Sequence, residues 1–418
     1  MLRAFTLITL MLFGLVSNPI PMNSATNPLQ KILNNLPDRF QQVIDNSGKF
    51  RLQILYTEIE RDQANRPSFT THRFRVSPGV YFYPASTVKL PAVALALERL
   101  NELQVDGLDK FTPLRIDSAH SGQTTVIHDS TAENNLPSVA HYIKKILLVS
   151  DNDAFNRLYE FLGPQYLNAD LHGKGYTHLK IVHRLSSPLS PEENRFTNPF
   201  TFYHGDQTLY YKPAEYNPEV YRFHLQDLDI GKGYIDSGSR IERPMDFSRK
   251  NYFALEEQHR ILQALIFPGS VPDTQRFYLT PDDYRFLRKQ MSMLPGESIY
   301  PSYSRDKYYD SWVKFFMYGD RKEAIPDNIR IFNKSGMAYG FLIDNAYVVD
   351  FQNEVEFLLS AVIYVNENNI LNDDNYEYER LGLPFLARLG WEVYQHERTR
   401  QREHTPDLSE FRYNYTGD

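Results

Sequence analysis

The segment from Tyr81 to Leu100 constrains the fold of this chain more than any other stretch. Three aromatic residues, Tyr81 to Tyr83, are typical of a strand end, and the run after Lys89 is apolar enough for a helix buried on nearly all sides. Ser86 and Lys89 are three residues apart, so a helix places them on one face, one turn from each other. At the start of a buried helix, the Ser86 hydroxyl lies near backbone N–H groups, and desolvation lowers the pKa of the Lys89 ammonium. This arrangement predicts a serine nucleophile whose proton Lys89 accepts.

The same Ser-x-x-Lys spacing recurs at Ser304/Lys307 and at Ser311/Lys314, where no buried helix follows. Both pairs lie in a segment rich in Tyr and Asp, which is typical of a solvated helix face or a loop. Ser86 is distinguished by two short motifs that follow it in the chain. They are Ser150-Asp151-Asn152 and Lys334-Ser335-Gly336.

The first of these motifs, Ser150-Asp151-Asn152, lies between two predicted helices. A hydroxyl at Ser150 is placed to relay a proton to a leaving nitrogen. The amide of Asn152 is able to bind the Lys89 amine and a substrate group at once. We expect Asp151 to brace the turn by accepting backbone N–H bonds. Alone, this tripeptide is also typical of a helix cap.

The second motif, Lys334-Ser335-Gly336, falls on a predicted strand. The Lys334 ammonium and the Ser335 hydroxyl are suited to binding a substrate carboxylate. Gly336 lets a substrate lie against the strand backbone as an added strand. The N–H groups of Ser86 and Met337 would then form an oxyanion hole. Alone, this tripeptide is also typical of a turn.

The order of the predicted elements indicates an α+β fold. Expected helices occupy residues 29–44, 139–149, 154–162, 252–265, 281–293 and 384–396, and expected strands occupy residues 50–60, 69–76, 329–336, 340–349 and 355–365. A hairpin is expected over residues 200–211, and residues 217–240 fit no element. The simplest architecture is a five-stranded antiparallel sheet built from both ends of the chain and flanked by helices. A helical lobe is inserted at about residues 90–325, and we expect a ligand cleft between sheet and lobe.

The amino terminus has the pattern of a secretory signal peptide. Met1-Leu2-Arg3 carries positive charge, an apolar run covers residues 4–16, and a polar, Pro-containing stretch follows. We place the signal peptide at residues 1–25, and the alternative is a buried core helix. Export to the periplasm or out of the cell is therefore expected, with no stable membrane span after the signal is removed.

Composition narrows the class of protein further. The 418 residues include no Cys, which excludes disulfides, thiolate metal sites and a lipid-anchoring Cys. The net charge is −7 and no Lys/Arg-rich face stands out, so nucleic acid is not an expected partner. No metal or nucleotide cofactor is expected, because the chain lacks an HExxH motif and a glycine-rich phosphate loop. Residues 26–400 are expected to form one domain, followed by a loose polar tail at 401–418.

The ordered motifs at Ser86, Ser150 and Lys334 resemble those of the penicillin-recognising serine hydrolases, and most of all class A β-lactamases. The order of elements matches that family over nearly the whole mature chain, which implies a β-lactamase/transpeptidase-like fold. The resemblance implies Ser86 as the acylated nucleophile, Lys89 as proton acceptor and Ser150 as proton relay. It also implies that Lys334 and Ser335 bind a substrate carboxylate.

The chain between Ser150 and Lys334 is longer than this family usually needs, which places an insertion near residues 200–240. Class A enzymes also hold the deacylating water with a Glu that closely follows an Arg-Leu-Asp-like turn. Here Arg184-Leu185-Ser186 matches that turn only in part, and Leu189 stands at the expected Glu position.

Two carboxylates follow later in the same loop, Glu192 and Glu193. We take Glu193 as the catalytic base for deacylation, because Asn198 lies closer to the family's spacing from it. Glu192, or neither residue, is the alternative. A base must come within hydrogen-bond reach of a water over the ester carbonyl.

The expected function is that of a serine acyl-transfer hydrolase that opens a β-lactam, and thereby confers antibiotic resistance, through an acyl-enzyme on Ser86. A peptidoglycan D-alanyl-D-alanine peptidase or an esterase of the same family uses the same acylation step. The third alternative is a penicillin-binding sensor that is acylated and does not turn over. The expected partner is a small molecule, a β-lactam or a peptidoglycan peptide, and the expected state is a monomer.

Overall fold

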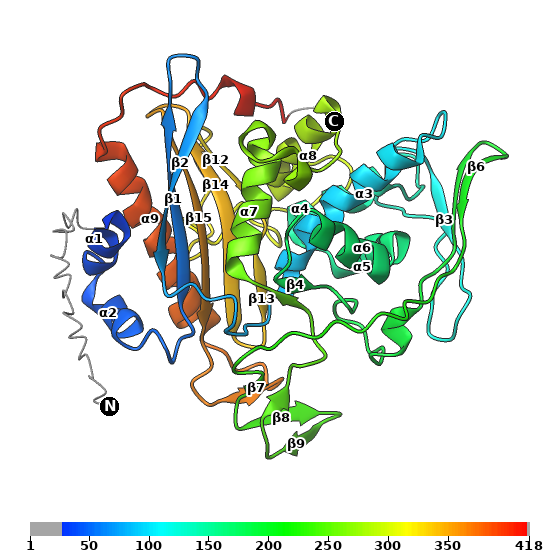
Figure 1. Cartoon of the computed structure of the whole chain (residues 1–418), viewed down its shortest axis with the longest axis horizontal. Coiled ribbons are helices and arrows are strands. Elements are labelled where there is room, and N and C mark those ends of the chain that lie inside the picture. Colours follow the sequence, from blue (N-terminus) through cyan, green and yellow to red (C-terminus); the bar gives the residue numbers. More distant parts are fainter. Residues whose placement is uncertain (1–26, 416–418) are drawn as a thin grey trace, which may run out of the picture.

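An antiparallel sheet forms the centre of the molecule in the computed structural model, which describes residues 27–415 (Figure 1). In spatial order its strands are β12 (Ile329–Asn333), β14 (Phe341–Asp350), β15 (Val355–Tyr364), β1 (Gln53–Arg61) and β2 (Pro67–Phe74), with β13 (Gly336–Ala338) beside the start of β14. In the middle of the sheet, Tyr56 of β1 lies opposite Leu359 of β15. Both ends of the chain therefore build the sheet, as predicted. The predicted signal peptide lies outside the described residues.

The predicted strand over residues 329–336 is divided in two. β12 ends at Asn333, β13 begins at Gly336, and both pair with β14. The predicted five-stranded antiparallel sheet is present, with β13 as a sixth, short strand. Lys334 and Ser335 interrupt the sheet edge where it meets the lobe.

Both faces of the sheet are covered by helices (Figure 1). One face carries α1 (Pro28–Asn34), α2 (Asp38–Asp45) and α9 (Leu383–Thr399), and the other carries α7 (Leu255–Ile266) and α8 (Pro281–Ser292). Successive residues of β15 divide between the two cores: Leu359 packs in the cluster that contains Phe385, and Leu358 in the one that contains Ile261. Burial on both faces explains why β14 and β15 are almost continuously apolar rather than alternating.

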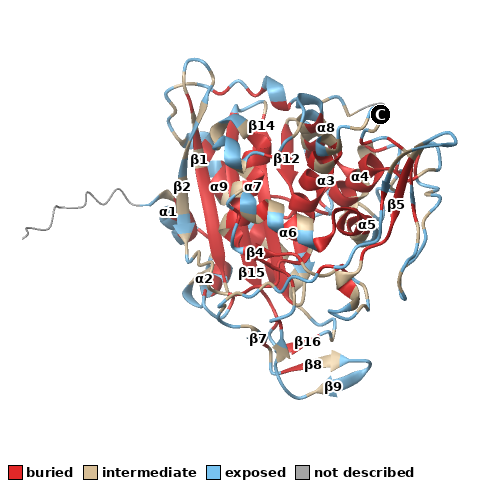
Figure 2. Cartoon of the chain, turned by 45° about the vertical axis from the view of Figure 1, so that its right-hand side comes forward, coloured by how far each residue is buried: buried red, intermediate tan, exposed pale blue. Residues whose placement is uncertain are grey.

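The helical lobe is built around α3 (Lys89–Leu103), which is buried along most of its length as the sequence predicts (Figure 2). Its neighbours are α4 (Val139–Val149), α5 (Asn152–Leu162) and α6 (Pro164–Gly173). A short strand pair, β4 (Leu179–Lys180) with β11 (Tyr252–Phe253), connects the lobe to α7. The turn at the start of α3 reaches the sheet edge at β13.

Residues 200–246, which include the insertion predicted near residues 200–240, form a hairpin and several short strands. β5 (Phe200–His204) and β6 (Gln207–Lys212) form the predicted hairpin, which turns at Gly205 and pairs with β3 (Leu114–Ile116). Further along lie β7 (Asp229–Ile230), β8 (Gly233–Asp236), β9 (Ser239–Ile241) and β10 (Met245–Asp246). β8 pairs with β16 (Ile370–Leu371), so the insertion lies beside a carboxyl-terminal segment at the lower edge of Figure 1.

Two predicted helices have different bounds in the structure. The helix expected over residues 29–44 is divided, because Pro37 lacks an N–H donor and disfavours helical backbone in the residue before it; α2 begins directly after it. The helix expected from residue 252 begins at Leu255, since Tyr252 and Phe253 pair with β4 instead.

The prediction of a loose tail is wrong for residues 401–415. Phe411 is 0% exposed, and its ring centroid lies 4.9 Å from that of Tyr347 and 5.8 Å from that of Phe267. Leu408 lies in the same core, Tyr413 packs against it, and the Tyr415 hydroxyl is hydrogen-bonded to Ser292 Oγ at 2.8 Å. These apolar and aromatic residues anchor an otherwise polar segment. In the part of the chain that the structure describes, no helix has the length and apolar character needed to cross a membrane.

Candidate active site

Ser86 lies on a short 3-10 turn, Ala85–Val88, that leads directly into α3. Ala85 holds a left-handed backbone with φ of 48°, a conformation that costs energy for a residue with a side chain and that clusters at functional sites. Ser86 is half-buried and opens on a cleft of about 380 Å³. The structure therefore places this hydroxyl at a helix start and within reach of a ligand.

Lys89, the first residue of α3, is 0% exposed. Its Nζ donates to the Ser150 carbonyl oxygen at 2.5 Å and to Asn152 Oδ1 at 2.6 Å, and lies 3.2 Å from Ser150 Oγ. Burial, and secondarily the like charge of Lys334, hold the pKa of Lys89 well below its usual range. Among the described residues, Ser86 Oγ and Lys89 Nζ are not joined by a hydrogen bond.

Ser150 is the point at which the three motifs meet. It caps the carboxyl end of α4 in a left-handed conformation with φ of 61°, which turns its carbonyl toward Lys89. Its Oγ accepts a hydrogen bond of 2.9 Å from Lys334 Nζ. Two amines therefore share one hydroxyl, and repulsion between them favours a state in which one is neutral.

Lys334 lies between β12 and β13 and is also buried. Besides Ser150 Oγ it binds the Ser335 carbonyl oxygen at 2.8 Å. Burial lowers the pKa of Lys334 to about 7, although the Asp344 carboxylate partly opposes that shift. Lys334 is thus charged or neutral within the physiological range, and an added carboxylate would favour the charged form.

Ser335 is turned away from this cluster. Its Oγ donates to the Val313 carbonyl oxygen at 2.9 Å, whereas Lys334 Nζ reaches Ser150 Oγ at 2.9 Å, so the two side chains point to different parts of the protein. Neither residue lines the cleft. The expectation that Ser335 binds a substrate carboxylate is not supported by this arrangement.

Gly336 packs directly against the start of the turn that carries Ser86, Ala85–Val88. A Cβ at this position would lie 2.9 Å from the Ser86 backbone nitrogen and 3.0 Å from the Pro84 carbonyl oxygen. Only glycine permits this approach, which puts β13 alongside Ser86. The next residue, Met337, lies on the same edge strand, lines the cleft and leaves its side chain 47% exposed. The proposed pair of oxyanion N–H donors, from Ser86 and Met337, thus comes from adjoining backbone segments.

Asn152, the first residue of α5, completes the group around Lys89. Its Oδ1 accepts from Lys89, while its Nδ2 donates to Ser186 Oγ at 2.8 Å. Asp151 caps α5 by accepting from the Ala154 N–H at 2.8 Å, as expected.

The loop after Arg184 does not bring Glu193 to the cleft. The Glu193 carboxylate accepts from the Ser190 N–H at 2.7 Å, and Glu192 binds the Tyr216 hydroxyl at 3.0 Å. Neither residue lines the space that holds Ser86; the loop residues that do are Leu185 and Ser186. The prediction of Glu193 as the deacylating base is therefore not supported.

The other two Ser-x-x-Lys pairs play no part in this site. Ser311 Oγ donates to the Arg321 carbonyl oxygen at 2.5 Å. Lys314 is fully buried and binds the backbone oxygens of Met291 and Ile331. Ser304 lies in an exposed turn. Only Ser86 combines a hydroxyl open to a cleft with a buried lysine one turn away.

Sequence reasoning missed the wall of the cleft that faces Ser86. It is formed by aromatic and polar residues from two separate loops: Tyr339, Asn372, Asp374, Tyr376 and Tyr378. The Tyr378 hydroxyl oxygen accepts a hydrogen bond of 2.7 Å from the Gly340 N–H. No local pattern marks these residues, since the second loop reaches the site through the pairing of β16 with β8.

Among the described residues, one cluster of three carboxylates has the spacing of metal ligands: Glu98, Glu102 and Asp170. The Lys174 ammonium already lies among them, 2.6 Å from Glu98 and 3.4 Å from Asp170. This ion pair accounts for the cluster without a metal.

Comparison with solved structures gives many matches of low identity. A β-lactamase from Desulfarculus baarsii is 15% identical, with 88% of this chain and 96% of that chain covered and a TM-score of 0.46. A β-lactamase from Xanthomonas campestris is 15% identical, with 88% of this chain and 98% of that chain covered and a TM-score of 0.45. A β-lactamase from Streptomyces albus G is 16% identical, with 86% of this chain and 98% of that chain covered and a TM-score of 0.43. No curated protein matches the sequence.

A protein-family model gives the firmer result. The model described as the β-lactamase enzyme family matches residues 35–280, which is more than half of the chain. The matched region includes Ser86, Lys89 and Ser150 and ends before Lys334. Because this model covers more than half of it, the chain belongs to the β-lactamase enzyme family and is a serine hydrolase.

Proposed function

We propose that this enzyme transfers an acyl group from a carboxylate-bearing amide, in the first place a β-lactam, to Ser86 and then to water. The observation that carries the proposal is the meeting of Lys89 and Lys334 on one hydroxyl, Ser150 Oγ, beside Ser86. One buried amine is then available to accept a proton, and the other to bind a substrate anion.

The hydrogen bonds of Lys89 fit the role of proton acceptor. A neutral amine has two N–H groups and one lone pair. The Ser150 carbonyl and Asn152 Oδ1 occupy the two N–H groups, so the lone pair remains for a hydroxyl proton, that of Ser150 Oγ at 3.2 Å in this structure or that of Ser86 in the reacting complex. Ser86 Oγ would come into range as substrate binds, since catalytic hydrogen bonds are often long in unliganded sites.

Acylation then proceeds in steps that each use a described group. Ser86 Oγ attacks the carbonyl carbon while Lys89 takes the hydroxyl proton, and the N–H groups of Ser86 and Met337 stabilise the oxyanion. Ser150 Oγ passes its proton to the leaving nitrogen as the C–N bond breaks and takes up the proton held by Lys89, which becomes neutral again. Lys334 holds the substrate carboxylate through a charge-assisted contact.

The residues available for deacylation favour a second candidate function, that of a peptidase or esterase. Ser186, and not a carboxylate, is the residue that the loop after Arg184 presents beside Asn152. Lys89 is then the base that activates water, as in a D-alanyl-D-alanine peptidase or an esterase. If no group activates water, the protein is a penicillin-binding sensor.

Rapid-mixing kinetics with a chromogenic cephalosporin separates these functions. A burst of one equivalent followed by steady turnover supports a β-lactamase. A burst without turnover, combined with release of D-alanine from an acyl-D-alanyl-D-alanine peptide, supports the peptidase. A burst with neither activity supports the sensor, and no burst at all rejects acylation of Ser86 by β-lactams.

We also propose that the enzyme acts in the periplasm or outside the cell, as a monomer, on a small molecule. The support for export is the signal-peptide pattern of residues 1–25. Fractionation of cells that express the full chain, with a mass measurement of the mature amino terminus, tests this proposal.

A further inference from the structure

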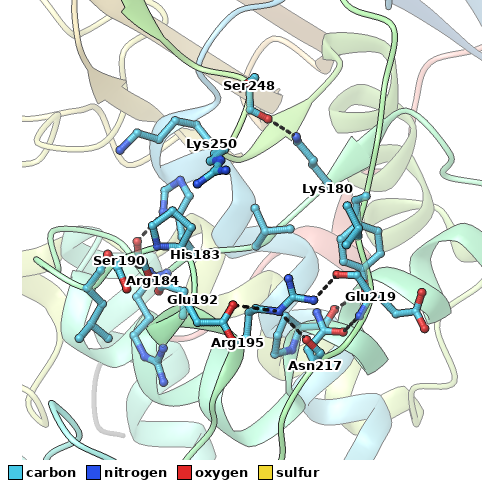
Figure 3. Close-up of a pocket in the computed structure, with 18 of the residues that line it drawn as sticks. Lys180, His183, Arg184, Ser190, Glu192, Arg195, Asn217, Glu219, Ser248 and Lys250 are labelled. Carbon is cyan, nitrogen blue, oxygen red and sulfur yellow. Dashed lines mark hydrogen bonds and ion pairs between the residues drawn. The ribbon is translucent and has the colours of Figure 1, made fainter.

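A second cavity, of about 890 Å³, lies on the far side of the loop that follows Arg184 (Figure 3). It is lined by the end of β4, by this loop, by residues 217–222 of the insertion and by residues 248–250. Its lining holds two carboxylates, Glu192 and Glu219, and six cationic side chains. These are Lys180, Arg184, Arg195, Arg222, Arg249 and Lys250.

Two of these cations already have partners within the protein. Arg184 Nε donates to Glu160 at 2.7 Å, in a buried ion pair. Arg195 Nε donates to the Asn217 carbonyl oxygen at 2.7 Å and lies 3.8 Å from Glu192. These two side chains hold the loop in place rather than wait for a ligand.

The other four cations have no such partner. Within residues 27–415, no carboxylate oxygen lies within 4.0 Å of the charged nitrogens of Lys180, Lys250, Arg222 or Arg249. Arg222 and Arg249 are exposed, whereas Lys180 is only 6% exposed and binds one backbone oxygen, that of Ser248, at 2.7 Å (Figure 3). Burial lowers the pKa of both Lys180 and Lys250. The Asp246 carboxylate acts on Lys180 from beyond 4.0 Å and only partly opposes the effect of burial on its pKa. An anion in the cavity would offset the remaining cost of burying these charges.

His183 adds a different polar group to the lining. Its Nδ1 lies 2.6 Å from the Arg184 carbonyl oxygen and therefore carries the proton, which leaves Nε2 as an acceptor. Nε2 is buried and has no partner among the described residues. Burial lowers the pKa of His183 to about 4, so the ring is neutral at pH 7. A ligand with both negative oxygens and a hydroxyl group matches this set of cations plus one acceptor.

The cavity and the Ser86 cleft share their walls. The His183 ring stacks on Tyr83, with centroids 6.2 Å apart and planes 2° from parallel, and Lys250 Nζ lies 5.9 Å from the Tyr339 ring centroid. Both tyrosines line the Ser86 cleft. Along the loop, Ser186 lines the cleft and Ser187 lines the cavity. A ligand in the cavity would thus lie one side chain away from the acyl site.

We propose that this cavity is a second binding site, separate from the Lys334 position, for a phosphate group carried on a small organic molecule. Multiple cations suit a dianionic phosphate better than a single carboxylate. The volume is that of a site for an organic ligand and exceeds the need of one free ion. The proposal does not depend on acylation of Ser86.

Calorimetric titration at constant ionic strength tests this site, with glucose 6-phosphate and inorganic phosphate as probes and glucose as the uncharged control. We expect glucose 6-phosphate to bind more tightly than inorganic phosphate, and glucose not to bind. If inorganic phosphate binds equally well, the organic part of the proposal is wrong; if neither phosphate binds at about 10 mM, the site itself is rejected. Ser86→Ala should bind as the parent does, which separates this result from the proposed function.

Variants locate the binding. Lys180→Met with Lys250→Met should weaken glucose 6-phosphate binding about tenfold or more, because two charge-assisted contacts are lost. Arg222→Ala with Arg249→Ala removes two exposed cations without touching the core and should weaken binding in the same direction. The matched control is Lys232→Met, an exposed lysine outside the cavity, which should bind as the parent does. Parent-like binding by both cavity variants would overturn the proposal.

Discussion

Replacing Gly336 with alanine tests whether β13 must lie against the nucleophile turn. The added Cβ would lie 2.9 Å from Ser86 N, 3.0 Å from Pro84 O and 3.2 Å from Ala85 Cβ. Ordinary contacts begin near 3.4 Å, so the two segments must separate by about 0.5 Å. None of these atoms belongs to a flexible side chain that could swing away. Overpacking of this kind costs about 1–3 kcal/mol of unfolding free energy.

The larger effect is expected on catalysis. Misplacement by 1 Å can cost about 100-fold in rate, so a shift of half that size at Ser86 should slow acylation by roughly tenfold. Stopped-flow measurement with a fluorescent penicillin gives that rate, and thermal unfolding gives the stability.

The control is Gly269→Ala, where no heavy atom lies within 4 Å of the added Cβ. This variant should acylate at the parent rate. The close approach of β13 to Ser86 is refuted as a catalytic feature if Gly336→Ala also acylates at the parent rate with unchanged stability.

Other perturbations have equally specific outcomes. Lys334→Met should cost about 1.5–3 kcal/mol in kcat/KM for a carboxylate-bearing substrate and far less for a neutral ester, and equal losses would make Lys334 structural. The pH profile of kcat/KM should be bell-shaped, because activity falls at low pH as Lys89 takes up a proton and falls above about pH 7 as Lys334 loses one. The Lys334→Met variant should therefore lose the decline in activity above about pH 7. Glu193→Gln should leave steady-state turnover unchanged, because Ser190 holds that carboxylate outside the cleft; an accumulating acyl-enzyme would contradict this. Phe411→Ala should cost about 3–5 kcal/mol in urea unfolding, and a loss near zero would show that the tail does not belong to the core.

The sequence was sufficient where chemistry depends on local spacing or on a recurring motif. Ser86 and Lys89 are one turn apart on any helix, and the structure brings Ser150 and Lys334 to them as the motif order predicts. The direction of Ser335 was not predictable in this way, because Lys334 and Ser335 lie between β12 and β13, where strand alternation does not apply.

Long-range contacts explain what the sequence could not supply. The position of Glu193 depends on a loop held by the ion pair of Arg184 with Glu160, which lie far apart in the chain. The cleft wall that contains Tyr376 and Tyr378 depends on the pairing of β8 with β16, residues 370–371. Phe411 looked like part of a polar tail because its partners come from three distant elements.

Covalent labelling identifies which serine is acylated. The parent protein is incubated with a fluorescent penicillin, digested, and the labelled residue is identified by peptide mass mapping. We expect a single acyl group on Ser86, and no label on Ser86→Ala protein whose thermal unfolding matches that of the parent. A label on Ser304 or Ser311, or a Ser86→Ala protein that is still acylated, would contradict the account.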